Sequence, residues 1–181
     1  MRQGEAPIGD GEMSANRSNA RRSKPLYTAE QRARRDATGW TLVQGVLAPA
    51  QFLVFLISLA LVGRFLLTGE GQEAATASVI VKTIVLYTIM ITGAVWEKVV
   101  FGRYLFADAF FWEDAFSMLV LALHTAYLAA LIGGAFEAKT QMAIALAAYA
   151  AYAINAAQFV LKLRAARLQG ARPLGLAEAT S

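Results

Sequence analysis

Apolar residues form four long runs along this chain of 181 residues. The runs cover residues 40–67, 77–95, 110–132 and 141–163, and short polar segments separate them. A helix rises about 1.5 Å per residue, so about 20 apolar residues cross the hydrocarbon layer of a membrane, which is about 30 Å thick. The pattern predicts an all-α membrane protein in which four transmembrane helices form a bundle.

The flanking segments are polar. Residues 1–24 are rich in Gly, Ser, Asn and Arg, and they predict a disordered tail. Residues 25–168 are expected to form the four-helix domain, and residues 169–181 a second flexible tail. Thr28 and Gln31 have the spacing of a capping box, which predicts a short basic helix through RARRDA before the first span.

The distribution of basic residues predicts the topology. Of the 17 Lys and Arg residues, 14 lie before residue 40, between the second and third runs, or from Lys162 onward. The positive-inside rule then places both termini in the cytoplasm. Basic residues at span ends also account for the net charge of +4, so no nucleic-acid partner is expected. Because cysteine is absent, disulfides and thiolate metal sites are excluded.

Polar residues inside the runs predict contacts between helices. We expect interhelical hydrogen bonds from Gln44, Gln51, Asn155 and Gln158. Lys82 lies near one end of the second run, and it is expected to extend its ammonium group to the membrane surface. A stripe of small residues at four-residue spacing predicts close helix packing: Ala143, Ala147 and Ala151.

Ionisable residues concentrate where the second run ends and the third begins. They are Glu97, Lys98, Arg103, Asp108, Glu113 and Asp114. One interpretation is that they are interfacial charges that cap the spans. The alternative is that the short connection brings the carboxyl groups together, so that one of them stays protonated and serves as a general acid.

His124 is the only histidine, and it falls inside the third apolar run. On a helix it shares a face with Glu113 and Ser117, and it lies roughly 16 Å deeper than Glu113. Ionisable groups at such a depth are usually functional. Three roles remain open: a ligand to the metal of a macrocycle, a proton shuttle, or a structural hydrogen-bonding residue.

Aromatic residues surround the charged cluster. They are Trp96, Phe101, Tyr104, Phe106, Phe110, Phe111 and Trp112. An interfacial aromatic belt explains them, and so does a flat apolar platform for a planar macrocycle.

Four segments together resemble a known enzyme family. They are LYTAEQRARRDATGWTLVQGVLAP, VWEKVVFGRYLF, FFWEDAFSMLVLALHTAYL and NAAQFVLKLRAARL. In this order they are similar to the vinyl bacteriochlorophyllide hydratases of anoxygenic phototrophs, over about residues 26–168. The resemblance implies hydration of the C3 vinyl group of chlorophyllide a, or a related bacteriochlorophyllide precursor, to a 1-hydroxyethyl group.

The residue roles are inferred from this sequence and not from the family. We expect Glu113 or Glu97 to deliver the proton and the other carboxylate to orient the water, with Asp114 in the same cluster. His124 is expected to bind the substrate's magnesium or to relay protons. The expected substrate-binding residues are Lys98 or Arg103 for the propionate carboxylate, together with Trp96, Tyr104 and Trp112.

The resemblance also implies a setting for the reaction. No cofactor is expected to be required, because magnesium belongs to the substrate. The expected partners are the chlorophyllide substrate, membrane lipid and other enzymes of pigment synthesis, in the bacterial inner or photosynthetic membrane. An alternative is a noncatalytic pigment-binding or assembly protein, which would need His124 but neither Glu97 nor Glu113.

Overall fold

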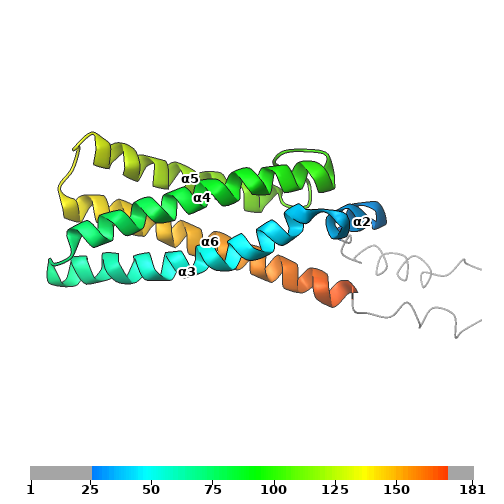
Figure 1. The fold of residues 1–181 in the computed structure, drawn as a ribbon, viewed down its shortest axis with the longest axis horizontal. Helices are drawn as coiled ribbons and strands as arrows, with labels where there is room; N and C mark the ends of the chain where they lie inside the picture. Colours follow the sequence, from blue (N-terminus) through cyan, green and yellow to red (C-terminus); the bar gives the residue numbers. More distant parts are fainter. Residues whose placement is uncertain (1–25, 171–181) are drawn as a thin grey trace, which may run out of the picture.

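The computed structural model describes residues 26–170, which form four long helices and one short one (Figure 1). The elements are α2 (Ala29–Ala37), α3 (Gly39–Thr68), α4 (Gln72–Phe101), α5 (Phe111–Ile132) and α6 (Ala138–Gly170). The predicted all-α architecture is confirmed, and no strand occurs within this part of the chain. The tail predicted over residues 1–24 lies outside the described residues. Of the tail predicted over residues 169–181, residues 169 and 170 instead end α6, and the rest lies outside the described residues.

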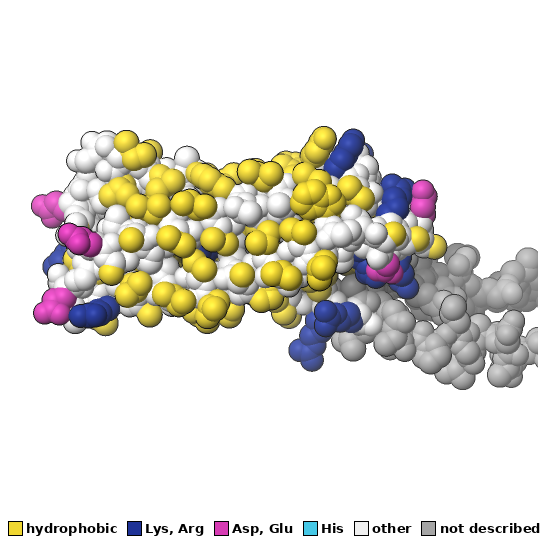
Figure 2. Space-filling view, in the orientation of Figure 1, with side chains coloured by type: hydrophobic (Ala, Val, Ile, Leu, Met, Phe, Trp, Pro, Cys, Tyr) yellow, Lys and Arg dark blue, Asp and Glu magenta, His cyan; other side chains and the backbone are white. Residues whose placement is uncertain are grey.

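The four long helices are long and apolar enough to cross a membrane. Apolar side chains cover the middle of the visible surface, and charged side chains gather at its two ends (Figure 2). Large apolar side chains that face outward include Leu53, Ile57 and Ile84, each more than half exposed. An apolar band between two charged rims fits a lipid environment, so the chain is a multi-pass membrane protein.

The helices pair as two antiparallel hairpins. α3 packs mainly against α4, and α5 packs mainly against α6. The turns after α3 and α5 lie at one end of the bundle, which we call the loop end (Figure 1). The connection between α4 and α5, together with α2, lies at the opposite end, which we call the acidic end. That the acidic end faces the cytoplasm stays a prediction from charge.

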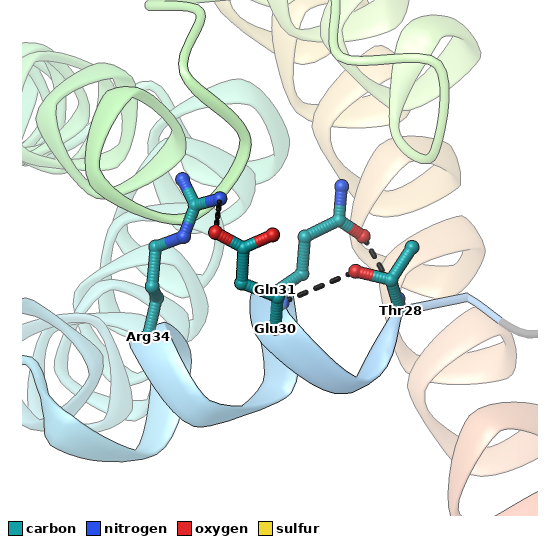
Figure 3. Close-up of polar contacts among 4 residues, drawn as sticks. All are labelled: Thr28, Glu30, Gln31 and Arg34. Carbon is teal, nitrogen blue, oxygen red and sulfur yellow. Dashed lines mark hydrogen bonds and ion pairs between the residues drawn. The ribbon is translucent and has the colours of Figure 1, made fainter.

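The predicted capping box is present at the start of α2 (Figure 3). The Gln31 backbone N–H donates to the Thr28 hydroxyl, and the Thr28 backbone N–H donates to the Gln31 side chain. These two bonds satisfy donors that the first helical turn leaves free. The ring of Tyr27, just before the cap, stacks on Phe101 at 5.7 Å between centroids, which ties α2 to the end of α4.

The stripe of small residues predicted on α6 is wrong for two of its three members. Ala143 and Ala147 are exposed, whereas Ala151 is buried, and the buried face of α6 also includes Met142, Ala145 and Ala148. Steps of three residues turn a helix by less than a full circle and steps of four by more, so a stripe picked by four-residue steps alone drifts off the buried face. α4 extends beyond the apolar run 77–95 at both ends, because its polar terminal turns also continue the helix.

Candidate functional site

The acidic end brings together three carboxyl groups from two helices. Glu97 lies in the last turns of α4, and Glu113 and Asp114 lie in the first turn of α5. All three are buried, with 4–7% of each residue exposed. Negative charge is favoured at the start of a helix, which accounts for the two on α5 but not for the one near the end of α4.

The connection 102–110 holds two of these carboxyl groups with consecutive backbone amides. The N–H of Phe106 donates to Asp114 Oδ2 at 2.7 Å between nitrogen and oxygen. The N–H of Ala107 donates to Glu97 Oε2 at 3.3 Å. Phe106 has a φ of +58°, which a bulky residue rarely adopts. This conformation turns adjacent amides towards two side chains, as in an anion-binding nest.

Because these two amides are consecutive along the chain, they hold the carboxyl groups of Glu97 and Asp114 near one another. We call these two carboxyl groups the acid pair. Two buried carboxyl groups held side by side can share one proton, which leaves one as an acid and the other as a base. The sequence predicted a carboxyl pair here, but it favoured Glu97 with Glu113.

Glu113 has a different partner. Its Oε2 accepts a hydrogen bond from Lys162 Nζ at 2.5 Å, and both side chains are largely buried. Lys162 comes from the distant end of α6, and sequence reasoning used it only to assign topology. A signal was available, because Asn155, Gln158 and Lys162 follow one another at three- and four-residue steps along one face.

Asn155, Gln158 and Lys162 form a row of polar side chains on α6, which we call the polar seam. Ser117 and Asn155 continue it towards the centre of the membrane. Asn155 Nδ2 donates to Ser117 Oγ at 2.8 Å, which confirms that Asn155 makes an interhelical hydrogen bond and shows that its partner is on α5. On the other hairpin, the predicted bond from Gln44 is also present, with Thr92 Oγ1 as its acceptor at 2.8 Å.

The aromatic residues divide into two groups. Trp96, Phe101 and Phe110 pack against each other at 5.8–5.9 Å between ring centroids and form a small core beside the acid pair. The outer group instead faces the surroundings: Tyr104, Phe106, Phe111 and Trp112. Tyr104 and Trp112 are thus the most exposed of the predicted aromatic binding residues, whereas Trp96 is only partly exposed.

The two predicted carboxylate-binding cations lie at the rim of this site. Lys98 Nζ donates to the Gly102 carbonyl and lies 5.2 Å from the centre of the Tyr104 ring. Arg103 is 3.6 Å from Asp108, and both side chains are mostly exposed. Neither cation contacts the acid pair, so both remain accessible to a charged ligand outside the bundle.

His124 is not part of this site. It is fully buried ten residues beyond Asp114 on α5, which corresponds to about 15 Å along the helix. Its Nδ1 lies 2.8 Å from the Val120 carbonyl, and its ring lies 5.9 Å from that of Tyr149. Proton transfer needs hydrogen-bond distance, so His124 cannot exchange a proton directly with the acid pair.

The expected extension of Lys82 to the membrane surface is wrong. Its side chain does not reach the membrane surface but is fully buried, with Nζ 3.7 Å from the centre of the Tyr152 ring. The reason is the length of α4, which begins at Gln72 and so places Lys82 ten residues inside the helix. From there a lysine side chain reaches neighbouring helices more easily than water.

Comparison with known proteins identifies the family. The family model for 2-vinyl bacteriochlorophyllide hydratase (BCHF) matches residues 27–165. A 2-vinyl bacteriochlorophyllide hydratase of Rhodobacter capsulatus is 70% identical over 148 residues, which cover 82% of this chain and 86% of the relative. One of Cereibacter sphaeroides is 71% identical over 143 residues, covering 79% and 89%. No solved structure matches. The chain belongs to the 2-vinyl bacteriochlorophyllide hydratase family.

Proposed function

We propose that this hydratase adds water across the C3 vinyl group of chlorophyllide a, or of a related bacteriochlorophyllide precursor, in a bacterial inner or photosynthetic membrane. Family membership makes the chain a hydro-lyase of bacteriochlorophyll synthesis. The observation that carries the residue assignment is the acid pair, in which one short loop holds two buried carboxyl groups side by side.

The proposed chemistry needs only one shared proton and one water. The protonated member of the pair gives its proton to the terminal vinyl carbon, and the positive charge forms on the inner carbon beside the macrocycle. The oxygen of water bonds to that carbon while the other carboxylate takes a proton from the water. The product is a 1-hydroxyethyl group, the pair ends with the proton count it started with, and no redox cofactor is required.

The backbone amides of Phe106 and Ala107 support the assignment of one carboxyl group as acid and the other as base. Each donates to one carboxylate oxygen, and this fixes the direction in which the remaining lone pairs and the proton point. Which of Glu97 and Asp114 starts as the acid depends on the approach of the substrate. The Glu113–Lys162 ion pair keeps the third carboxylate occupied and its charge balanced.

The substrate is proposed to lie against the outer aromatic group. Planar macrocycles stack on aromatic side chains, and Tyr104 and Trp112 are more than half exposed beside the acid pair. Arg103 or Lys98 then holds the propionate carboxylate at the membrane surface. Substrate magnesium remains part of the substrate in this arrangement, and His124 takes no part in its binding.

Isotope labelling tests the proposed reaction. Membranes from a host that makes no chlorophyll and expresses this chain are supplied with chlorophyllide a in water enriched in heavy oxygen, and in a parallel reaction in heavy water. We expect a product that is heavier by one water, with the labelled oxygen in the new hydroxyl group. In heavy water, one deuterium should appear in the new methyl group.

A matched host without the chain controls for background chemistry. The hydratase of Rhodobacter capsulatus, run in parallel, shows that the supplied pigment is usable. If the parallel enzyme forms product and this chain binds the pigment but leaves it unchanged, the proposed reaction is wrong. That result would favour the noncatalytic pigment-binding alternative.

A further inference from the structure

All four long helices contribute polar side chains to a second cluster, deep inside the bundle. We call it the mid-bundle cluster: Ser58, Ser78, Lys82, His124, Tyr149 and Tyr152. Ser58, Lys82, His124 and Tyr149 lie eight to eleven residues from the helix ends at the loop end, which corresponds to about 12–16 Å. This depth is inside the apolar band.

Two atoms of this cluster stand out because nothing among residues 26–170 hydrogen-bonds to them. They are Lys82 Nζ and His124 Nε2, and both residues are fully buried. The hydroxyl groups nearby are engaged, since Ser58 Oγ lies 2.5 Å from the Tyr149 hydroxyl and 2.7 Å from Ser78 Oγ. A buried donor or acceptor without a partner costs several kcal/mol, roughly 2–7, so native structures normally supply one.

The two atoms lie in one region. Lys82 Nζ lies 3.7 Å from the centre of the Tyr152 ring, and the His124 ring lies 5.9 Å from that of Tyr149, three residues earlier on α6. The two atoms do not hydrogen-bond to each other directly.

The chemistry of the two atoms selects the kind of molecule. His124 Nδ1 faces the Val120 carbonyl, so this nitrogen carries the proton and Nε2 of the neutral ring is an acceptor. An ammonium group has donors only. A bridging molecule must accept from Lys82 and donate to His124, which a halide anion cannot do.

We propose that the mid-bundle cluster is an internal water-binding site, in which water accepts a hydrogen bond from Lys82 Nζ and donates one to His124 Nε2. The Tyr152 ring, with its centre 3.7 Å from Lys82 Nζ, covers one side of this nitrogen. Buried waters in proteins typically make about three hydrogen bonds to groups that otherwise lack partners.

The site continues towards the acidic end. Buried side-chain oxygens of Gln51, Asn155 and Gln158 also have no hydrogen-bond partner among the described residues. On α6, Asn155 and Gln158 follow Tyr152 at three-residue steps, and Lys162 comes four residues after Gln158. Resting on the proposed function, this polar seam holds further waters and supplies the molecule that is added to the vinyl group.

Hydroxyl-radical footprinting with X-ray pulses tests the water site without any substrate. Radicals formed from bound water oxidise adjacent side chains even when bulk solvent cannot reach them. In the full chain in lipid discs we expect oxidation of Tyr149 and Tyr152, each at most 8% exposed. Met142 is fully buried in apolar surroundings and is intrinsically more reactive, so it should stay unmodified as the dry control.

Substitutions of Lys82 separate water binding from folding. Lys82→Met keeps the length of the side chain but has no donor, and Lys82→Gln keeps a donor and an acceptor. We expect Lys82→Met to reduce oxidation of Tyr152 several-fold and to slow hydration about tenfold, since the variant loses a hydrogen-bond donor to the bound water. Lys82→Gln should retain part of both. The matched control is Lys139→Met, at an exposed position on α6 near the loop end.

The stability of the variants gives an independent readout. Replacing a buried charge by an apolar side chain of similar volume is often neutral or stabilising, so Lys82→Met should unfold at an equal or higher temperature. Loss of hydration without loss of stability supports the proposal. Unmodified tyrosines in the wild-type chain would overturn the water site. Oxidised tyrosines with full hydration activity in Lys82→Met would overturn its role in supply, whereas absence of wild-type activity counts against the proposed function alone.

Discussion

The acid pair and the mid-bundle cluster differ in how their buried polar groups are hydrogen-bonded. At the acidic end, Glu97 and Asp114 each accept a backbone hydrogen bond, and Glu113 has Lys162 as its partner. In the mid-bundle cluster, Lys82 Nζ and His124 Nε2 have no such partner among residues 26–170. Both regions are buried, so burial alone does not distinguish them.

The difference reflects what each helix segment can offer. The connection 102–110 leaves helical geometry, so its amides are free to donate to side chains. In the middle of four continuous helices, the backbone donors are already used within each helix, and only side chains or small molecules can serve as partners. Carboxyl groups that are fixed by backbone can be aimed at a substrate, whereas the deeper cluster is proposed to take its partners from bound water.

The largest effect is expected at the acid pair. Glu97→Gln and Asp114→Asn keep the size of each side chain but remove the shared proton, so each should lower the hydration rate at least about a hundredfold. The measurement is the rate of hydroxyethyl product formation per amount of folded protein. Glu73→Gln makes the same change on α4 at the loop end, where it is exposed, and should leave the rate unchanged.

The same measurements, made also on a His124 variant, can show that the acid pair is not the reacting site. A noncatalytic pigment carrier needs a magnesium ligand but no carboxyl pair. If His124→Phe abolished pigment binding while Glu97→Gln left the chain's behaviour unchanged, the acid pair would not be the reacting site.

A smaller effect is expected from the Glu113–Lys162 ion pair. Glu113→Gln and Lys162→Met each leave a partly buried group without its partner, which should cost about 1–3 kcal/mol of stability and lower hydration roughly tenfold. The double variant should lose less than the sum of the two single variants, because both changes remove the same interaction. Thermal unfolding and initial rates for all four proteins measure this.

The outcome decides between two assignments of the acid. If Glu113→Gln reduced the rate as much as Glu97→Gln, with stability retained, Glu113 itself would deliver the proton. The ion pair seen with Lys162 would then have to open during the reaction.

Variants at Phe106 are expected to differ in stability by about 1 kcal/mol. Its positive φ is costly for a side chain with a β-carbon but not for glycine. Phe106→Gly and Phe106→Ala both remove the ring, but only the alanine keeps the cost, so the glycine variant should be more stable by about 1 kcal/mol. Comparison of their unfolding temperatures in lipid discs measures it. Equal stabilities would mean that the connection 102–110 relaxes and does not hold the acid pair rigidly.

The smallest effect is expected at the rim. Arg103→Gln should raise the substrate KM a few-fold and leave kcat unchanged, because an exposed cation contributes to binding but not to the reacting atoms. Added salt should reduce the difference between the variant and the wild type. Arg64→Gln is a matched control, since Arg64 forms a similar exposed ion pair with Glu70 at the loop end. A fall in kcat for Arg103→Gln would contradict its assignment as a binding residue.

The spans and the capped α2 helix were predictable from sequence because their signals are local. A run of about twenty apolar residues identifies a span whatever it packs against, and the Thr28–Gln31 box lies within one helical turn. The family could also be identified from sequence, through segments spread over most of the chain. The prediction of carboxyl groups gathered between the second and third spans was confirmed, because a short connection keeps the helix ends together.

The pairing of those carboxyl groups was not predictable. Glu113 and Asp114 are adjacent in sequence but point about 100° apart on the helix, and their partners come from different elements. Sequence periodicity relates residues within one helix only. It therefore linked Glu113 with His124 on one face, although they lie in separate polar regions.

The sequence by itself determined that the chain crosses a membrane four times, where its polar groups lie along each helix, and which enzyme family it belongs to. These properties follow from composition, hydrogen bonding within a helix, and similarity along the chain. The tertiary structure decided that Asp114 joins Glu97, that Lys162 joins Glu113, and that Lys82 turns inward to the level of His124. Those outcomes depend on the rotation and offset of each helix relative to its neighbours, which packing of the whole bundle sets.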